Sequence, residues 1–398
     1  MKQLQDAYIV AATRTPIGKS HKGYLRNMRP DDLLATTMKA VLAQAPNLDP
    51  LAIEDVICGC AIPEAQQGLN VARIATVLAG LPVGVGGVTV NRFCASGLTA
   101  LQMAADRIRV GEADVMIAAG VESMSMVPMM GNSPSLSPSI FERAGDVGIA
   151  YGMGLTAEKV AQRWKVSRDA QDAFALQSHQ RALAAQQAGY FADEMTPITV
   201  TDRSVDIAKG EATSQSRTIS LDEGPRLDTS IDGLAKLKTV FAARGSVTAG
   251  NSSQTSDGAG ALLVVSEAAL KRFNLTPLAR FVSYASKGVP PEIMGIGPIE
   301  AVPVALRHAG LKLQDMDWIE LNEAFAAQSL AVIHDLGMDP SKVNPMGGAI
   351  ALGHPLGATG AIRAATVVHA LQRNKLKYGM VTMCVGMGQG AAGILERV

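Results

Sequence analysis

Each half of the chain carries the same order of strand-like and helix-like segments, and this internal repeat limits the possible folds most strongly. In the first half, a strand-like run at residues 55–60 precedes a helical pattern at 70–78. A short strand-like run at 88–90 follows, and then a loop with Cys94, a second helical pattern and an apolar run at 114–119. A repeated order of this kind indicates two copies of one folding unit.

The second half repeats this order with different residues. Strand-like runs at 318–321 and 378–383 enclose a helical pattern at 324–336 and a loop with His354. Strands that alternate with helices predict right-handed crossovers and mainly parallel sheets with helices on both faces. Two such units predict a pseudo-symmetric pair of α/β domains, with a functional site where strand ends from both halves meet.

The segment at residues 123–247 interrupts the repeat. It begins with a methionine-rich stretch at 124–130. A long amphipathic helix is predicted from Ser167, a residue type favoured as an N-cap, to Gly189, a typical stop signal. Residues 204–218 are polar and predict a loop. We interpret the segment as an inserted subdomain that covers a site or makes subunit contacts.

Composition excludes several classes of protein. The chain has 398 residues, of which 47% are hydrophobic, so it can bury a large core in two or three domains. The formal net charge is zero and no basic run is present, which argues against a nucleic-acid partner. No apolar stretch approaches the ~20 residues that span a bilayer. A strand-like run starts at residue 7, which leaves no room for a signal peptide and predicts a cytoplasmic protein.

Two of the four cysteines lie in settings that suit a reactive thiol. Cys94 sits within Asn-Arg-Phe-Cys-Ala-Ser-Gly, and Cys384 begins Cys-Val-Gly-Met-Gly-Gln-Gly. Small residues weaken packing, but they let a substrate and backbone N–H groups approach the sulfur closely. Four cysteines in a chain of this length fit a reducing compartment rather than a disulfide framework.

The residue types around these thiols indicate acyl transfer through a thioester. Cys94 precedes a predicted helix, whose positive end favours a thiolate, as a nearby imidazole would. His354 is the only one of six histidines that lies in a glycine-rich loop. Cys384 could act as an acid or base, and Asn322 could orient a water or a carbonyl. The N–H groups beside Cys94 and within residues 386–388 could form an oxyanion hole.

Other candidates have structural explanations. Cys58 and Cys60 lie along an apolar strand, where a cysteine is usually a small core residue, and no further ligands sit at zinc spacing. The run Gly-Lys-Ser at 18–20 lacks the first glycine of a phosphate-binding loop. Residues 386–390 lack the spacing of a dinucleotide-binding fingerprint. The methionines at 124–130 fit two interpretations equally, an ordinary core and an adaptable apolar wall for an acyl chain.

Four motifs resemble the signature blocks of the thiolase family. They are the cysteine motif at 91–97, Asn-Glu-Ala-Phe at 322–325, Gly-Gly-Ala-Ile-Ala-Leu-Gly-His-Pro at 347–355, and Cys-Val-Gly-Met-Gly at 384–388. Residues 153–158 and 247–252 are similar to loop-domain and binding-loop motifs of the family. The resemblance covers nearly the whole chain, and the blocks together are highly specific.

The resemblance implies an α/β fold with a five-layered α-β-α-β-α core and an inserted loop domain. The implied domains are an N-terminal domain at 1–122 plus 248–272, a loop domain at 123–247 and a C-terminal domain at 273–398. A homodimer or homotetramer is implied, with a β-oxidation hydratase/dehydrogenase subunit as a candidate partner. The implied reaction is CoA-dependent cleavage of a 3-ketoacyl-CoA to acetyl-CoA and a shortened acyl-CoA, with CoA as substrate and no tightly bound cofactor or metal.

The resemblance also implies roles by position. Cys94 matches the nucleophile that takes the acyl group, and His354 matches the histidine that activates it. Cys384 matches the acid/base that protonates the leaving acetyl-CoA enolate. Asn322 matches the residue that holds a catalytic water, and with the histidine it forms one oxyanion hole. The N–H groups of Cys94 and Gly386 match the second oxyanion hole.

Three positions match contacts to CoA, and two depart from the family pattern. Arg226, Ser253 and Met153 match the CoA-contacting positions. Met387 stands where many relatives have glycine, which narrows the space beside the second cysteine. Gly152 stands where biosynthetic relatives often carry histidine, which weakens that subtype.

Several functions remain compatible with the motifs. The preferred interpretation is a degradative 3-ketoacyl-CoA thiolase of fatty acid β-oxidation that accepts chains longer than acetoacetyl. The alternative is an acetyl-CoA acetyltransferase that acts in Claisen condensation. A decarboxylating ketoacyl synthase is disfavoured because Cys384 is present. A non-catalytic lipid-binding relative is disfavoured because all four motif residues, Cys94, Asn322, His354 and Cys384, are retained.

Overall fold

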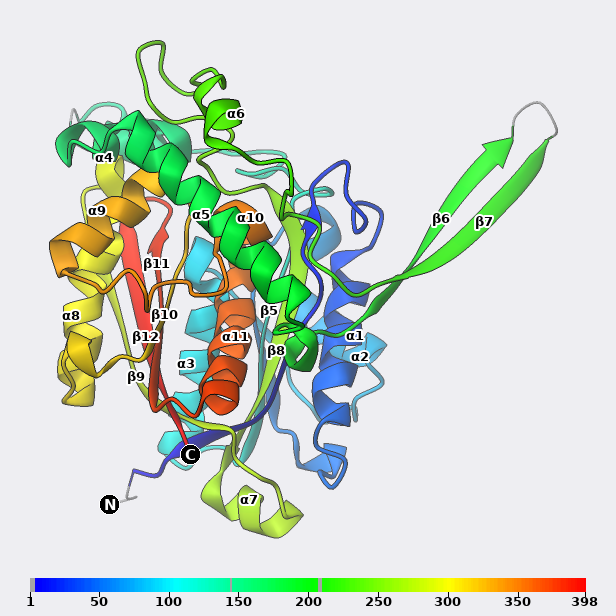
Figure 1. Cartoon of the computed structure of the whole chain (residues 1–398). Helices are drawn as coiled ribbons and strands as arrows, with labels where there is room; N and C mark the ends of the chain where they lie inside the picture. The colour runs from blue at the N-terminus through cyan, green and yellow to red at the C-terminus, as the bar shows by residue number, and fades with distance from the viewer. Residues whose placement is uncertain (1–3, 144, 207–209) are drawn as a thin grey trace.

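The computed structural model describes residues 4–143, 145–206 and 210–398 of the chain. Its core is built of five stacked layers, in which α3 and α11 lie side by side between two halves of a sheet (Figure 1). The helices of the three helical layers are α1 (Pro30–Ala43) with α2 (Val71–Leu78), α3 (Ser96–Arg109) with α11 (Thr359–Asn374), and α8 (Gly297–Ala309) with α9 (Ala326–Leu336). The predicted α-β-α-β-α core is therefore confirmed.

The strands of the two halves join into one sheet, which has ten strands within the described ranges. The strands of the first half are β1 (Ala7–Arg14), β2 (Gly18–Lys19), β3 (Asp55–Gly59), β4 (Val88–Val90), β5 (Val115–Ser123) and β8 (Ser256–Ser266). Those of the second half are β9 (Ala279–Gly288), β10 (Trp318–Leu321), β11 (Tyr378–Val385) and β12 (Gln389–Arg397). The halves join where Tyr8 and Ile9 of β1 pair with β9.

The strand order confirms the repeat. The first half runs β4-β3-β5-β8-β1, and the second half runs β10-β11-β12-β9, with Val343 bridged to Ile319 at the place that corresponds to β4. The predicted parallel character is wrong, however. Pairs β3–β4, β3–β5 and β10–β11 are parallel, whereas β5–β8, β1–β8, β11–β12 and β9–β12 are antiparallel. In the second half β11 returns directly into β12 through a short turn, and a direct return gives antiparallel pairing.

The connection between those two strands differs most between the halves. In the second half, β11 and β12 form a hairpin through a short turn at residues 386–388. In the first half, β5 and β8 pair in the same way, but residues 124–255 lie between them. The interrupting segment seen in the sequence is thus an insertion into a hairpin. It includes α4 (Met153–Arg163), α5 (Arg168–Gln187) and α6 (Ile231–Ala235); the short helices α7 (Glu267–Phe273) and α10 (Ala349–Leu352) lie outside it.

The two central helices touch at a pair of glycines near their first turns. A Cβ added to Gly97 would lie 2.7 Å from the backbone nitrogen of Ala361. A Cβ added to Gly360 would overlap the backbone nitrogen of Leu98. Only glycine permits this approach from both sides, so the starts of α3 and α11 meet at the centre of the core.

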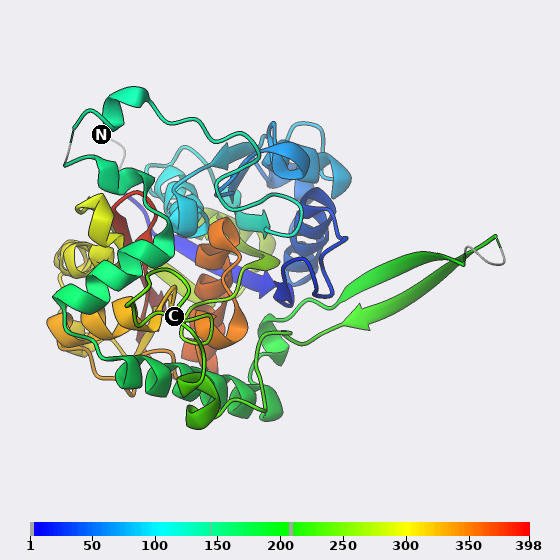
Figure 2. The same ribbon diagram turned by 90° about the horizontal axis from the view of Figure 1, so that it is seen from above.

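The inserted segment contains the long helix that was predicted and a β-ribbon that was not. Helix α5 begins after Ser167, whose hydroxyl accepts a hydrogen bond from the Ala170 N–H, and this confirms the predicted N-cap. The expectation of a loop over residues 204–218 is wrong. Strands β6 (Ile198–Asp206) and β7 (Glu211–Ile219) form an antiparallel ribbon that projects from the body in both views (Figures 1 and 2). Residues 207–209 of the expected loop lie outside the described residues.

Hydroxyl pairs explain the strands in this polar stretch. Thr201 lies opposite Ser216, with their oxygens 2.9 Å apart, and Ser204 lies opposite Thr213 at 2.6 Å. Threonine favours extended backbone, and cross-strand hydroxyl pairs stabilise it, although neither feature shows as alternation of apolar residues. Among the described helices, none is both long and apolar enough to cross a bilayer.

Candidate active site

Cys94 lies in a tight turn between β4 and α3. The turn is a single 3-10 segment, Phe93–Ala95, and Phe93 has a φ of +41°, in the left-handed region. Two side chains hold it: Asn91 accepts a hydrogen bond from the Phe93 N–H at 2.7 Å, and Ser96 donates to the Phe93 carbonyl at 2.7 Å. The turn presents the Cys94 side chain to a cavity while leaving it only 8% exposed.

The surroundings of Cys94 shift the pKa of its thiol in the direction opposite to the one expected. Burial raises the pKa of Cys94 to about 11, against the lowering effect of hydrogen bonds from its own N–H and that of Gly386. Desolvation thus acts against the helix start, which was expected to favour a thiolate. The two N–H groups nevertheless converge on the sulfur, as predicted from the sequence.

His354 is fixed from several sides. Its N–H donates to the Gln254 carbonyl and to Ser256 Oγ, both at 3.2 Å. Its ring Nδ1 lies 2.7 Å from the hydroxyl of Thr359, and its Nε2 lies 3.3 Å from Nδ2 of Asn322. Burial and the charge of Arg363 lower the pKa of His354 to about 3, so the imidazole is neutral and can accept a proton.

Asn322 directly follows β10, and Cys384 is the second-last residue of the neighbouring strand β11. Asn322 is buried, and its Oδ1 has no hydrogen-bond partner among the described residues. Cys384 is fully buried, and burial together with the nearby Cys94 raises its pKa. The turn after it is unusual, since Met387 has a φ of +65°. The carboxyl ends of both strands thus bring these side chains to one edge of the sheet.

One cavity of about 410 Å³ brings most of the predicted residues together. Cys94, His354, Cys384, Met153 and Ser253 all line it. Of the other three predicted residues, Gly386 and Arg226 line neighbouring cavities, and Asn322 contacts the histidine ring. The two thiols and the imidazole therefore face one space, which neither half of the chain could build alone.

A smaller cavity of about 50 Å³ continues beyond the nucleophile turn. Cys94, Met129, Met153 and Leu356 line both spaces, so the two are neighbours. The other lining residues are mainly apolar, and none of the described ones is charged; they are Ile62, Phe93, Met130, Ile149, Tyr151, Gly386 and Met387. Two methionines of the 124–130 stretch therefore line a cavity, while Met124 is buried and borders the larger space.

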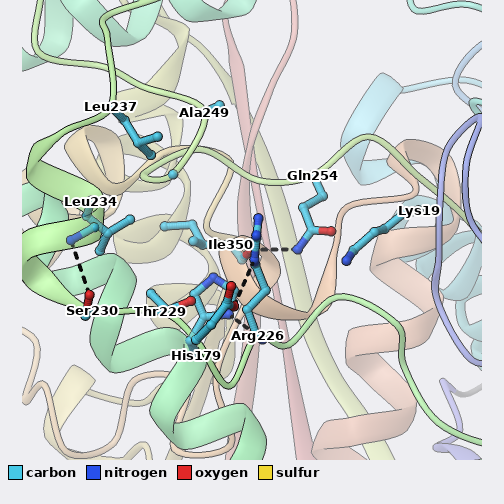
Figure 3. A pocket seen from close by; sticks show the side chains of 13 residues that line it. Lys19, His179, Arg226, Thr229, Ser230, Leu234, Leu237, Ala249, Gln254 and Ile350 are labelled. Atoms are coloured by element: carbon cyan, nitrogen blue, oxygen red, sulfur yellow. Dashed lines mark hydrogen bonds and ion pairs between the residues drawn. The ribbon is translucent and has the colours of Figure 1, made fainter.

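An outer cavity of about 360 Å³ adjoins the central one, since Gln254 lines both. Figure 3 shows Lys19 on one side of it and Arg226 with His179 on the other. The Nδ1 of His179 accepts a hydrogen bond from the Arg226 N–H at 3.2 Å. Burial and the two neighbouring cations lower the pKa of His179 to about 4, so this ring is neutral and its second nitrogen can donate.

Sequence reasoning missed three residues at these cavities. Thr359 orients the imidazole, yet a threonine at a helix start is too common to single out. His179 lies on a helix face with Ala175 and Ala182, both buried, and this spacing is the signal that could have indicated an inward-facing histidine. Lys19 was considered only as part of a phosphate-loop motif and set aside, and nothing else in its sequence neighbourhood indicates a cavity.

The chain matches known proteins over its full length. It matches "Thiolase, N-terminal domain" over residues 7–268 and "Thiolase, C-terminal domain" over residues 275–397. It is 48% identical over 394 residues to the 3-ketoacyl-CoA thiolase of Bacillus subtilis (strain 168), covering 99% of this chain and 100% of that protein. It is 45% identical over 411 residues to the 3-oxoadipyl-CoA/3-oxo-5,6-dehydrosuberyl-CoA thiolase of Escherichia coli (strain K12), with the same coverage.

A solved structure gives the same result. The crystal structure of human mitochondrial 3-ketoacyl-CoA thiolase in complex with CoA has a TM-score of 0.88 and 40% identity, and the match covers 100% of this chain and 99% of that one. The fold, the two thiols at one cavity and these matches to both halves agree. The chain belongs to the thiolase family, whose members are acyltransferases that act on CoA thioesters.

Proposed function

We propose that the protein is a 3-ketoacyl-CoA thiolase that cleaves aliphatic substrates by a ping-pong mechanism. One observation carries this proposal: two thiols and a neutral imidazole face a cavity with a cationic space on one side and an apolar space on the other. A 3-ketoacyl-CoA has the same order of parts, with phosphates at one end, the reacting carbons in the middle and a hydrocarbon chain at the other.

In the first step, the thiol of Cys94 gives its proton to His354 as its sulfur attacks the 3-keto carbon. The bond between carbons 2 and 3 then breaks, and Cys384 protonates the acetyl-CoA enolate. The thiol of a second CoA gives its proton to the Cys384 thiolate as it attacks the acyl thioester, and Cys94 leaves with the proton that His354 holds. Burial favours the neutral thiol of Cys94 and the neutral imidazole of His354, so we place the proton transfer in the same step as the attack.

Two groups of donors support the negative oxygens formed in these steps. The N–H groups of Cys94 and Gly386 converge at the nucleophile and suit the acyl oxygen. Asn322 and His354 form the second group, 3.3 Å apart. The unpartnered Oδ1 of Asn322 supports a role in holding a polar ligand atom, because a buried amide oxygen normally has a partner.

We assign the outer cavity to the nucleotide part of CoA. Lys19 and Arg226 supply positive charge there, and no described acid forms an ion pair with the Lys19 side chain. Ser253 and Met153 line the central cavity between the cations and the thiols, where the pantetheine arm would lie. This arrangement favours the predicted CoA contacts and adds Lys19 to them.

The acyl end favours a hydrocarbon chain over a chain that ends in a carboxylate. The E. coli relative is named for 3-oxoadipyl-CoA, whose acyl chain carries such a carboxylate. Lys159 lies over the ring of Tyr151, which lines the small cavity, and Glu292 already pairs with this lysine at 2.9 Å. A carboxylate buried without a free cation is strongly disfavoured, so we do not expect 3-oxoadipyl-CoA to be the preferred substrate.

A chain-length series tests the proposal. We expect CoA-dependent cleavage of 3-ketooctanoyl-CoA and 3-ketododecanoyl-CoA to exceed that of acetoacetyl-CoA in kcat/KM, because each buried CH₂ adds up to about 0.8 kcal/mol. If acetoacetyl-CoA is preferred by roughly tenfold, about 1.4 kcal/mol, the alternative acetyl-CoA acetyltransferase replaces this proposal. A preference for 3-oxoadipyl-CoA would contradict the apolar acyl site. Met387 is the residue on which a short-chain preference would depend, because it narrows this space.

We further propose that the protein forms a homo-oligomer through β4, the edge strand of the sheet. An open edge strand invites pairing with another chain. Large apolar side chains gather near it: Leu69 is 95% exposed and Val83 is 90% exposed. Val77 and Val88 are also exposed. Sedimentation of the wild-type protein and of a Val83→Lys variant tests this, since the variant should be more dissociated; a wild-type monomer would contradict it.

A further inference from the structure

Glu122 is a buried carboxylate at the end of β5 to which the reaction steps above give no task. Only 1% of the residue is exposed. One oxygen, Oε2, accepts hydrogen bonds from the N–H groups of Ala61 at 2.7 Å and Gly357 at 2.8 Å. The other, Oε1, accepts from the Ile62 N–H at 3.3 Å and from the Gln67 amide. The Cys60 thiol also donates to Oε1, at 3.8 Å. All five partners are donors, so the group is held as an acceptor-only anion.

No cation among the described residues forms an ion pair with this carboxylate. Burial raises the pKa of Glu122, while the hydrogen bonds from Ala61, Gly357, Gln67 and Ile62 lower it. A buried charge without a counter-ion is costly, even when N–H dipoles surround it. An apolar residue would be cheaper at this position if packing were the only requirement.

The repeat gives the position of Glu122 a meaning. Gly120 of β5 pairs with the last residue of β3, and Thr382 of β11 pairs with the last residue of β10. Glu122 and Cys384 each lie two residues further along their strands. Glu122 therefore occupies in the first half the position that Cys384 occupies in the second.

The partners of Glu122 belong to both halves. Gly357 lies in the loop that joins His354 to α11, whereas Ala61 and Ile62 lie in the half that carries the nucleophile, and Ile62 lines the apolar cavity. The loops are in direct contact here, since a Cβ added to Gly357 would lie 2.5 Å from the Ala61 nitrogen. The carboxylate is thus a bridge between the backbone of the two loops.

We propose that Glu122 is a positioning residue that fixes the His354 loop against the nucleophile half, and this role rests on the proposed function. The consequence is a constant distance between the imidazole and Cys94. Misplacement by about 1 Å in such a site can cost about 100-fold in rate, so even a small release of the loop should be visible in kcat.

The charge of Glu122 supplies a second readout. After burial and the local N–H groups, it is the one further influence on the Cys94 thiol, and it raises the pKa. The other titratable groups near that thiol are His354 and Cys384 in the same cavity, and Cys58 and Cys60 beside the carboxylate. Removing the charge should therefore lower the pKa of Cys94 even in the absence of substrate.

The test is a Glu122→Gln variant, which keeps the shape and removes the charge. We expect kcat for 3-ketoacyl-CoA cleavage to fall by about 10- to 100-fold. The KM for CoA should stay within about twofold, because the outer cavity is distant from this bridge. Alkylation of Cys94 by iodoacetamide, followed across pH by peptide mass spectrometry, should give a lower apparent pKa than in the wild type.

A Gln67→Met variant makes the test sharper. It removes a donor that lowers the pKa of Glu122, so the carboxyl is protonated more easily and the pKa of Cys94 should fall, as in Glu122→Gln. Glu54→Gln is the matched control. Glu54 accepts hydrogen bonds from the N–H groups of Asp114 and Val115 at the opposite end of β5, and its replacement should change neither kcat nor the alkylation profile.

The outcomes separate this role from a purely structural one. A lower apparent pKa of Cys94 in both variants, with a loss confined to kcat, supports the bridge. A higher pKa in either variant, no shift, or an unchanged kcat in Glu122→Gln overturns it. If Glu122→Gln does not fold, the fall expected in Gln67→Met decides the matter. Alkylation needs no acyl-CoA, so a failure of the proposed substrate does not obscure this result.

Discussion

The two halves of the molecule contain equivalent turns, and only one of each equivalent pair carries a reacting group. Cys94 corresponds to Gly357, because each is the middle residue of the 3-10 turn before α3 or α11. Cys384 corresponds in the same way to Glu122. Beside the start of α3, two thiols meet at a cavity. Beside the start of α11, a carboxylate accepts a hydrogen bond from a backbone N–H.

This difference teaches that the repeated fold determines where the turns lie and leaves their chemistry free. The short turn after β11 is part of the active site, whereas the equivalent connection after β5 became a long insertion. Each half therefore supplies groups that the other half lacks. The following predictions test this comparison.

Replacement of the nucleophile should have the largest effect. Cys94→Ser should lower kcat/KM by roughly 10³- to 10⁶-fold, the range seen when a covalent nucleophile is removed, because a serine hydroxyl is far from ionised. Peptide mapping after incubation with an acyl-CoA should find the label on Cys94. Cys60→Ala is the control, because the Cys60 thiol is buried beside Glu122. This variant should still be acylated on Cys94. A label on Cys384 would reverse our assignment of the two ends.

The two residues from the second half should fail at different steps. Loss of a general acid or base typically costs about 10²- to 10⁴-fold, so both His354→Ala and Cys384→Ala should be severely impaired. Cys384→Ala should still form an acyl-enzyme with a simple acyl-CoA, whereas His354→Ala should form it slowly. Single-turnover acylation measures this, and equal defects in the two variants would mean that the roles are wrong.

A methyl group added at the contact between α3 and α11 should lower the stability of the fold rather than change the chemistry of the active site. Gly360→Ala forces a Cβ against the backbone of α3, and overpacking of this kind typically costs about 1–3 kcal/mol. Gly97→Ala should have a similar cost, because the contact is reciprocal. Thermal unfolding compares both with Gly84→Ala, where a Cβ would meet nothing within 4 Å. Equal melting temperatures in all three variants would show that the central contact adapts.

The smallest predicted effect concerns a buried pair that only the second half contains. Burial raises the pKa of Glu320 to about 7, against the lowering effect of Arg363, while the equivalent residue of β3 is Cys58. A raised pKa means that the protonated form stabilises the fold below about pH 4.5, and that this contribution is lost as pH rises through 7. Glu320→Gln should remove this decline.

Denaturant unfolding at several values between pH 5 and 8 measures the decline, whose slope is at most about 1.4 kcal/mol per pH unit for one group. The difference between wild type and variant isolates Glu320 from the other buried acids, Glu122 and Glu323. A parallel pH dependence in the two proteins would contradict the assignment.

The repeat, the helices and the main cavity residues could be predicted because each follows from local pattern. Strands and helices follow apolar periodicity, and Cys94, His354 and Cys384 stand in glycine-rich motifs that resemble a known family. The direction of β8 could not be predicted, because it depends on where the chain returns after the insertion. The ribbon of β6 and β7 was missed because its polar residues hide the alternation of a strand.

The thiol pKa could not be predicted from the same pattern. The helix start and the imidazole near Cys94 suggested a thiolate, but the depth of burial is a property of the assembled halves. Lys19 and Glu122 share this difficulty, because each gains its role from a residue far away in the sequence. Long-range contacts of this kind leave no local signal.

The glycine contact between α3 and α11 has a consequence for how such a chain can change over generations. A Cβ at position 97 or 360 would lie closest to a backbone nitrogen of the other helix. A larger residue at either position cannot be compensated by trimming a neighbouring side chain, since the nearest atom belongs to every amino acid. We therefore expect substitutions at these two positions to be tolerated less well than substitutions in the inserted segment or on the outer helices.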